Sequence, residues 1–158
     1  MQDHPKDGAA VRVPPPLVYL AGVIVGVLGH AFVMPLPIEL ATAWRIALTA
    51  TAAAPAVVLL AGAVGLFRRT GQDPKPWEPT PEIISTGVYR FTRNPMYVGL
   101  ACLQLAIGFG LANGWVILLV PVVLAVVHVT AIRHEEAYLE GKFKDEYARY
   151  KASVRRWI

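Results

Sequence analysis

The stretch Arg90-Phe-Thr-Arg-Asn-Pro-Met-Tyr-Val-Gly99 opens the segment that decides the fold, and Arg133-His-Glu-Glu136 closes it. Between them, 39 residues from Asn94 to Ile132 contain no Asp, Glu, Lys or Arg. One helix of that length would be about 58 Å long, roughly twice the ~30 Å hydrocarbon core of a bilayer. Asn113-Gly114, near the middle, is a typical turn dipeptide. The stretch therefore predicts a hairpin of two membrane helices that returns both polar clusters to the same side.

The composition indicates an all-α integral membrane protein. The chain is 55% hydrophobic and 16% charged, with a mean hydropathy of +0.46, whereas soluble domains carry about 25% charged residues. A single cysteine, Cys102, excludes a disulfide framework. The net charge is +4, but no basic surface with stacking aromatic residues is set apart from the apolar segments. We therefore expect the lipid bilayer, and no nucleic acid, as a partner.

We expect one domain, residues 1–158, with four transmembrane helices and an amphipathic C-terminal helix. Small residues at near-helical spacing, Gly22, Gly26 and Gly29, predict close packing of the first helix. A long proline-rich loop separates the second and third helices, and such loops are often functional. The expected parts are a flexible arm at 1–16, membrane helices at 17–34, 46–67, 95–112 and 115–132, and a cytoplasmic tail at 134–158.

The C-terminal tail has an apolar stripe with helical periodicity. Apolar residues recur at intervals of three or four, which is typical of an amphipathic helix that Gly141 could interrupt. Two roles stay open for this helix: lying on the membrane surface or covering a site between the helices. The stripe consists of Leu139, Phe143, Tyr147, Tyr150, Val154 and Trp157.

The distribution of basic residues predicts the orientation in the membrane. With four crossings, both termini and the loop before the third helix lie on one side, together with fourteen of the fifteen Lys and Arg residues. Only Arg45 lies on the other side. The positive-inside rule therefore places both termini, and the polar clusters, in the cytoplasm. The expected location is the inner membrane of a bacterial or archaeal cell.

The start of the third helix is a candidate anion site. Asn94 suits the N-cap and Pro95 the first helical position. A helix N-terminus favours an anionic group such as a carboxylate, and Arg90 and Arg93 would add to that attraction. The alternative is that both arginines bind lipid phosphates. The motif alone does not separate these interpretations.

The adjacent acids Glu135 and Glu136 follow a membrane helix directly. Two acids at a helix C-terminus oppose the helix dipole and repel each other. Either Arg133 offsets them on a solvated face, or they form a site for a cationic ligand. The aromatic residues Tyr89 and Tyr97 fit either an interface belt or a pocket wall. No cysteine pair, HxxxH or HExxH spacing occurs, so we expect no metal site.

Together these motifs resemble the isoprenylcysteine carboxyl methyltransferase family, which is related to the membrane phospholipid methyltransferases. The resemblance covers Ser85 to Ile158: Thr86-Gly-Val-Tyr-Arg-Phe-Thr-Arg-Asn-Pro-Met-Tyr-Val-Gly99, the charge-free hairpin, and the Glu135-Glu136 pair with its periodic tail. It implies an all-helical membrane enzyme that uses S-adenosylmethionine and releases S-adenosylhomocysteine. The cofactor would lie at the cytoplasmic face, and a lipophilic acceptor would enter from the bilayer.

The resemblance also implies the site residues. Arg93, Asn94, Tyr97 and Glu135 are the candidate catalytic residues, and His134 or Glu135 would be the base for an amine acceptor. Relatives typically have His in place of Asn94, and many have Gly in place of Lys144 and Pro in place of Arg155. The candidate cofactor-binding residues are Tyr89, Arg93, Asn94, Pro95, Tyr97, Gly99, His134, Glu135, Glu136, Tyr147, Tyr150 and Arg156.

The sequence therefore favours methyl transfer to a lipophilic or membrane-soluble acceptor, such as the carboxylate of a prenylcysteine-like compound. The alternatives are a phospholipid amine or small-thiol methyltransferase, and a non-catalytic membrane subunit that retains the fold. A transporter would carry polar groups at the bilayer midplane. We identify none in the helix centres, apart from Asn113 at the predicted turn and His30 away from the centre.

Overall fold

The computed structural model describes residues 7–158, and the regular secondary structure of this part of the chain is helical. It contains no β-strand, only one isolated bridge between Pro37 and Asn113. The predicted all-helical fold is therefore confirmed. The elements, in chain order, are α1 (Pro15–Leu28), the π-helix η1 (Gly29–Val33), α2 (Thr42–Thr70), the 3₁₀ helix η2 (Gly87–Arg90), α3 (Pro95–Gly110), α4 (Gly114–Leu118), α5 (Val120–Val127), the π-helix η3 (His128–Ile132) and α6 (Arg133–Ser153).

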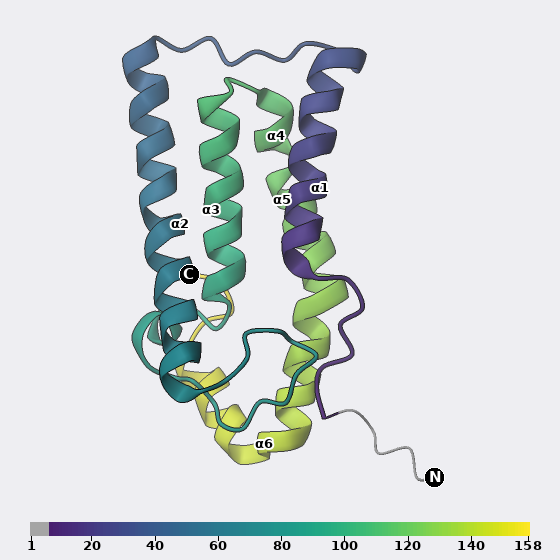
Figure 1. Cartoon of the computed structure of the whole chain (residues 1–158), viewed down its shortest axis with the longest axis vertical. Coiled ribbons are helices and arrows are strands. Elements are labelled where there is room, and N and C mark those ends of the chain that lie inside the picture. Colours follow the sequence, from purple (N-terminus) through teal and green to yellow (C-terminus); the bar gives the residue numbers. More distant parts are fainter. Residues whose placement is uncertain (1–6) are drawn as a thin grey trace.

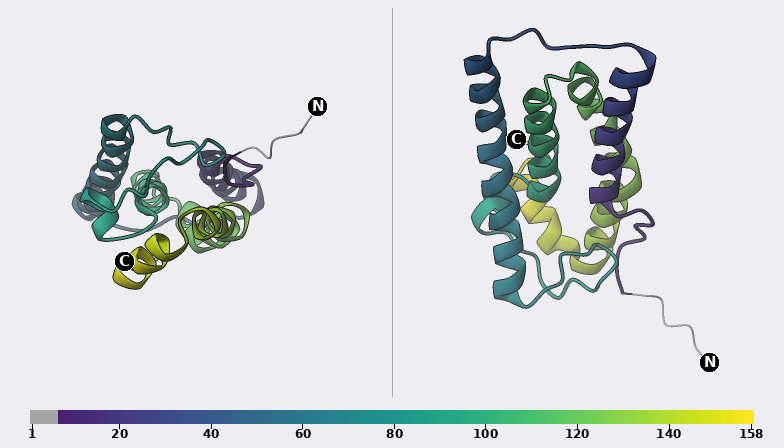
Figure 2. Two further views of the ribbon diagram at one scale, coloured as in Figure 1. Left: turned by 90° about the horizontal axis from the view of Figure 1, so that it is seen from below. Right: turned by 45° about the horizontal axis from the view of Figure 1, so that its top comes forward.

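The helices form a four-membered bundle of α1, α2, α3 and a segmented helix (Figure 1 and Figure 2). The segmented helix consists of α4, α5 and η3, leads into α6, and is called the α4–α5–η3 column below. Three helical stretches are long and apolar enough to cross a membrane: Pro15–Val33, Thr42–Thr70 and Gly114–Ser153. The remaining apolar helix, Pro95–Gly110, has 16 residues, about 24 Å at ~1.5 Å per residue. That length is short for a ~30 Å hydrocarbon core, so the fourth crossing and the orientation of the termini stay predictions.

The helix boundaries differ in detail from those expected. The predicted ranges 17–34, 46–67 and 95–112 correspond to α1 with η1, α2 and α3, and α2 is longer than expected at both ends. The predicted helix at 115–132 is divided into α4, α5 and η3. Pro121 lies in the first turn of α5, where its missing N–H group removes a helical hydrogen bond to the preceding turn. The proline explains why the column is interrupted there.

Glycine residues let α1 approach the neighbouring column closely. A Cβ atom on Gly22 would lie 2.4 Å from Val123, and one on Gly26 would lie 2.8 Å from the backbone of Val116. Any side chain at these positions would therefore push the helices apart. The predicted close packing is confirmed at these two glycines. At Gly29 the space is less tight, since a Cβ there would lie 3.6 Å from Trp115.

The turn between α3 and α4 lies where Asn113-Gly114 predicted it. The Asn113 side chain accepts a hydrogen bond from the Val116 N–H at 3.2 Å and so caps α4. Gln104, in the middle of α3, corrects our statement that the helix centres lack polar groups. Its side chain is 1% exposed and donates to the Val116 carbonyl at 3.0 Å. This hydrogen bond satisfies the donor of the buried amide, whereas its Oε1 has no partner among the described residues.

The described part of the N-terminal arm, from residue 7, contacts the proline-rich loop at one end of the bundle (Figure 1). In the arm, residues 1–6 lie outside the described residues, but Ala9 and Val11 are buried, and the Ala9 N–H donates to the Pro76 carbonyl at 2.9 Å. This part of the arm is therefore packed, in contrast to the flexible arm we expected. The cause is the pairing of its backbone with the proline-rich loop, which the sequence does not reveal.

The C-terminal helix α6 bends sharply and returns toward the start of α3 (Figure 2). The bend is at Lys144, with φ 42° and ψ −114°, and not at Gly141, the residue we expected to interrupt the helix. The bend directs Tyr147, which is 2% exposed, and Tyr150 onto the bundle. Of the two roles left open for the tail, this packing fits the second, covering a site between the helices.

Candidate functional site

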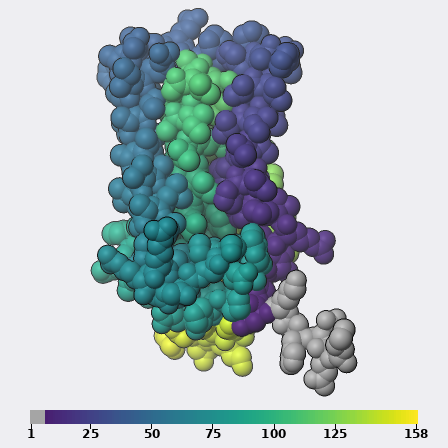
Figure 3. Space-filling model, viewed as in Figure 1, coloured from purple at the N-terminus to yellow at the C-terminus, as the bar shows by residue number. Residues whose placement is uncertain are grey.

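A cavity lies at the end of the bundle where α3 begins and α6 folds back. Its volume is about 140 Å³, smaller than the ~300–1,000 Å³ that is typical of ligand pockets, and it is open to solvent. The proline-rich loop, residues 71–86, crosses this end of the molecule and forms the outer wall (Figure 3). Nine predicted site residues line the cavity: Tyr89, Arg93, Asn94, Pro95, Tyr97, Glu135, Glu136, Tyr147 and Tyr150.

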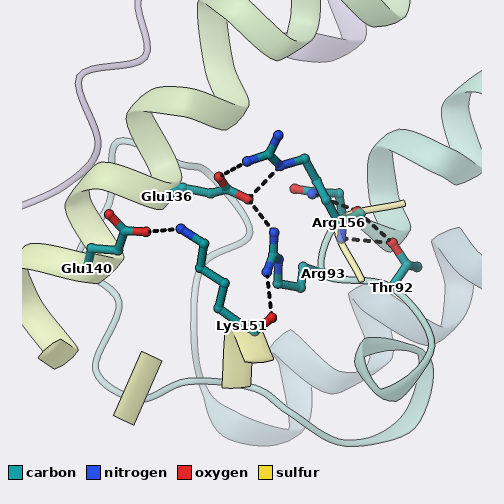
Figure 4. Close-up of polar contacts among 7 residues, drawn as sticks. Thr92, Arg93, Glu136, Glu140, Lys151 and Arg156 are labelled. Carbon is teal, nitrogen blue, oxygen red and sulfur yellow. Dashed lines mark hydrogen bonds and ion pairs between the residues drawn. The ribbon is translucent and has the colours of Figure 1, made fainter. Parts of the chain in front are cut away.

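The inner wall of the cavity is formed by the start of α3 and by α6. Two arginines hold Glu136 on this wall (Figure 4). Its Oε1 accepts from Arg93 Nη2 at 3.1 Å and from Arg156 Nε at 3.0 Å, and its Oε2 accepts from Arg156 Nη2 at 2.8 Å. The side chains of Arg93 and Glu136 are only 8% and 11% exposed. Because two arginines face one carboxylate, this group carries a net positive charge. The pairing with two arginines explains why a buried acid is tolerated at this position, and it neutralises the charge of Glu136.

Arg93 retains a donor that the protein does not use. Its Nη1 donates to the Lys151 carbonyl at 3.0 Å and its Nη2 to Glu136, whereas its buried Nε has no partner among the described residues. Buried polar groups are normally hydrogen-bonded, so each exception calls for an explanation. A cationic donor that is buried, unpaired and adjacent to a cavity is suited to an anionic ligand.

Asn94 holds the C-terminal segment instead of capping its own helix. It is at the N-cap position of α3, as predicted, but its side chain makes no capping hydrogen bond. Its Nδ2 donates instead to the Arg156 carbonyl at 3.0 Å, as does Thr92 Oγ1 at 3.1 Å. The Arg93 N–H donates to the Arg155 carbonyl at 3.0 Å. These bonds fix the tail on the start of α3, so that Arg156 reaches Glu136.

Tyr97 and Glu135 are joined across the cavity by a hydrogen bond from the tyrosine hydroxyl to Oε1 of the acid. The Tyr97 carbonyl accepts from Tyr19 Oη at 2.8 Å, which ties this part of α3 to α1. Glu135 follows the uncharged stretch 94–132, and so lies outside the predicted membrane-spanning helix 115–132. Burial raises its pKa to about 7, although the bond from Tyr97 acts in the opposite direction. A carboxyl group with such a pKa can take up or release a proton near neutral pH.

Three tyrosines form an aromatic side of the cavity. Tyr150 Oη donates to the Tyr89 carbonyl at 2.8 Å, and the rings of Tyr147 and Tyr150 are 6.1 Å apart. Burial raises the pKa of Tyr89 and raises that of Tyr150 to about 12. Both hydroxyls therefore keep their protons at neutral pH and act as hydrogen-bond donors.

Three predicted site residues do not line the cavity. Gly99 packs against α2, where a Cβ atom would lie 2.9 Å from Leu60, so its contact is between helices. His134 is exposed on α6. Arg156 is behind Glu136, which it holds in place. Among residues 7–158, no group of three His, Cys, Asp or Glu side chains is placed to hold a metal ion.

Sequence reasoning missed residues of the outer wall and of its contacts with α6 and the arm. Gln72 is 8% exposed, and neither atom of its side-chain amide has a partner in the described part of the chain. Tyr138 accepts from the Thr80 N–H at 3.2 Å and donates to Asp7 Oδ1 at 2.8 Å. Lys142 also binds Asp7, at 2.7 Å. The loop carries no periodic signal, so nothing in the sequence distinguished these residues from other polar residues nearby.

Comparisons with known proteins agree with this geometry. The model of the phospholipid methyltransferase family matches residues 57–146, more than half of the 158-residue chain. The matched range includes the start of α3 and both glutamates, and ends before Tyr147. An uncharacterized protein of Haemophilus influenzae is 44% identical over 63 residues, which cover 40% of this chain and all of that protein. No solved structure matches the chain.

Proposed function

Because the chain belongs to the phospholipid methyltransferase family, we propose that it transfers a methyl group from S-adenosylmethionine to a lipophilic acceptor. The reaction would take place at the cytoplasmic face of the membrane. When bound, the cofactor supplies an electrophilic methyl group on a sulfonium. The chain's own residues would bind it, orient it and exclude water, and such positioning accounts for much of the catalysis of a displacement reaction.

The observation that carries this proposal is the unpaired Nε of Arg93 at the cavity wall. The methionyl part of the cofactor ends in a carboxylate, which is the acceptor that a buried guanidinium donor requires. The N-terminus of α3, a helix of 16 residues, adds a favourable dipole for the same group. The net positive charge of Arg93, Arg156 and Glu136 favours an anion as well. The residues present therefore fit the cofactor.

The remaining predicted residues have separate roles in this proposal. Tyr89 and Tyr150 would keep their phenolic protons and line the cavity as walls. Glu135 would accept a proton on its carboxylate, with Oε1 positioned by the hydrogen bond from Tyr97. An amine acceptor must lose a proton, and Glu135 has a pKa near 7, which is suitable for a base. A carboxylate or thiolate acceptor would not need this step. The raised pKa of Glu135 thus favours an amine, such as a phospholipid headgroup, as the second candidate acceptor.

The proposed orientation rests on the charge distribution. Four crossings, with α3 as a short one, would place the cavity and both termini on the side that holds fourteen of the fifteen Lys and Arg residues. In this arrangement the acceptor reaches the cavity from the bilayer, between the helices, and the cofactor enters from the cytoplasm. The inner membrane of a bacterial or archaeal cell fits this topology.

The test is calorimetric binding of S-adenosylhomocysteine to the purified protein in lipid nanodiscs. We expect saturable binding by the wild type and at least tenfold weaker binding by Arg93→Met. The matched control is Arg90→Met, which removes the same charge from an exposed residue outside the cavity. Equal affinity of all three proteins would remove Arg93 from the site. No binding by folded wild-type protein would favour a non-catalytic membrane subunit.

Methyl transfer itself can be followed with labelled S-adenosylmethionine and membranes that contain different acceptor lipids. Label in the lipid fraction would identify the acceptor class. We expect Glu135→Gln to abolish transfer to an amine while cofactor binding is retained. Transfer to an amine at the wild-type rate would exclude Glu135 as the base.

A further inference from the structure

Gln72 is a residue of the cavity wall whose buried side-chain amide has no hydrogen-bond partner among the described residues. The side chain is 8% exposed, lines the cavity, and has neither Oε1 nor Nε2 hydrogen-bonded within residues 7–158. Its backbone is fixed, because Gly71 ends α2 in the left-handed conformation with φ 68° and the Gln72 N–H donates to the Phe67 carbonyl at 2.9 Å. The amide is therefore held in place by the end of a long helix.

A buried amide with no partner destabilises the protein by itself. Both its donor and its acceptor lose their hydrogen bonds to water and gain none from the protein. In the cavity wall, such a group is explained by a ligand that supplies the complementary pair. A carboxamide presents one donor and one acceptor in a single plane, so the complementary ligand is planar and offers an acceptor beside a donor.

The surroundings of Gln72 favour a flat, largely apolar ligand group. Phe67 and Tyr89 meet edge to face, with ring centroids 6.2 Å apart, and both line the cavity together with Ile83 and Ile84. An aromatic and aliphatic lining of this kind suits a heteroaromatic ring. The charged residues of the cavity come from both sides: Arg93, Glu135 and Glu136 from the segment before α3 and from α6, and Asp73, Lys75 and Glu82 from the loop. Gln72 belongs to the part of the cavity formed by α2 and the loop.

We propose that the amide of Gln72 recognises the adenine base of the cofactor. Adenine carries an amino donor beside a ring-nitrogen acceptor, and Gln pairs with this edge through two hydrogen bonds. The inference rests on the proposed function, which it extends by assigning a residue that selects the base. It also gives the proline-rich loop a function: the loop contributes one wall of the base-binding end.

Gln72→Leu separates this role from a structural one. Leucine has a similar volume and no polar atoms, so the ligand-free variant keeps or raises its thermal unfolding temperature in detergent. We expect the variant to bind S-adenosylhomocysteine about tenfold more weakly, the effect of one or two lost hydrogen bonds. Gln72→Met, which keeps the length of the side chain, repeats the test should the leucine variant not fold. The control is Gln104→Leu, a buried amide outside the cavity, which keeps wild-type affinity.

A second ligand identifies the part of the cofactor that the amide contacts. The probe is the counterpart of S-adenosylhomocysteine that has purine in place of adenine and so lacks the amino group. We expect loss of the amino group to weaken binding severalfold in the wild type but not in Gln72→Leu. A weakening of the same size in both proteins would overturn the proposal, since the amide would then contact the ribose or another group.

The outcomes also separate this inference from the proposed function. If S-adenosylhomocysteine binds the wild type and Gln72→Leu equally well, the proposed function stands and the role of Gln72 is wrong. If it binds neither, although both proteins are folded, the proposed function fails and the inference fails with it.

Discussion

The two walls of the cavity are held by different kinds of contact. The inner wall, made by the start of α3 and by α6, rests on buried charges: Glu136 between Arg93 and Arg156 (Figure 4). The outer wall, loop 71–86, is held by single hydrogen bonds, from the Thr80 N–H to Tyr138 of α6 and from the Ala9 N–H of the arm to the Pro76 carbonyl. The arm in turn is tied to α6 by the ion pair of Asp7 and Lys142, whose side chains are 54% and 27% exposed. Exposed ion pairs contribute about 0–1 kcal/mol, whereas removing one partner of a buried pair costs about 3–5 kcal/mol.

This difference indicates how a ligand could enter. The inner wall is preformed, because its side chains are tied to one another and to the C-terminal backbone. The outer wall can separate from α6 when a few exposed bonds break, and long loops over a site often have this role. We therefore expect one wall to be fixed and to orient the ligand, and the other to open for its entry.

The largest expected effect is on the inner wall. Glu136→Gln removes the carboxylate between two arginines and leaves the buried Arg93 unpaired. We expect a loss of stability on the order of 3 kcal/mol, measured by thermal unfolding in detergent. The control is Glu140→Gln, whose pair with Lys151 is about half exposed and should contribute less than about 1 kcal/mol. Similar losses in both variants would show that the inner wall is no more rigid than the surface.

The second effect is a pH dependence that comes from Glu135. Its pKa is about 7 in the folded protein against 4.5 for an ordinary glutamate, so the folded state retains a proton that the unfolded state releases. Stability contributed by this group is complete below pH 4.5 and is lost as the pH rises to about 7. We expect Glu135→Gln to reduce the change in the free energy of unfolding over this pH range. The control Glu140→Gln should show the same pH dependence as the wild type. An identical slope in Glu135→Gln would contradict the assignment.

A smaller effect is expected at the bend that turns α6 onto the inner wall. Lys144 has a φ of 42°. Residues with a Cβ atom are strained in this backbone conformation, whereas glycine adopts it readily. Lys144→Gly should therefore stabilise the protein by about 1 kcal/mol. Glycine at the helical position Glu140 should destabilise it by about 1 kcal/mol. Destabilisation by both glycines would mean that the bend does not need a glycine-like backbone.

The smallest effect on stability is expected at the outer wall. Asp7→Asn breaks the exposed ion pair with Lys142, so the unfolding temperature should remain within error of the wild type. Dissociation of S-adenosylhomocysteine should become severalfold faster, because the arm, whose Ala9 N–H donates to the Pro76 carbonyl of the loop, is then held less firmly on α6. The exposed residue Asp145, changed to Asn, removes the same charge from another part of the chain. An unaltered dissociation rate in Asp7→Asn would show that the ion pair does not hold the loop.

Much of the bundle could be predicted because its signals are local. The uncharged run predicted the hairpin, Asn113-Gly114 predicted its turn, and the spacing of Tyr147 and Tyr150 predicted that they share a helix face. The hairpin also explains how Arg93 and Glu136, 43 residues apart in sequence, come to lie in one cavity. These features follow from charge, periodicity and turn chemistry, each of which acts over a few residues.

The rest depends on contacts between distant segments, which no local pattern reveals. The Asn94 side chain bonds to the Arg156 carbonyl instead of capping α3, because the tail returns to that position. Gln72 is in a proline-rich loop without periodicity, so its burial could not be inferred. The bend at Lys144, three residues beyond Gly141, likewise follows from the packing of Tyr147 on the bundle and not from helix propensity.

The most direct test of the two-wall account is hydrogen exchange of the protein in nanodiscs, with and without saturating S-adenosylhomocysteine. The account predicts slow exchange of residues 92–94 and 154–156 in both states. It predicts fast exchange of residues 72–84 in the free protein and strong protection when the ligand is bound. Equal exchange of the loop in both states, at a ligand concentration that calorimetry shows to be saturating, would contradict the account.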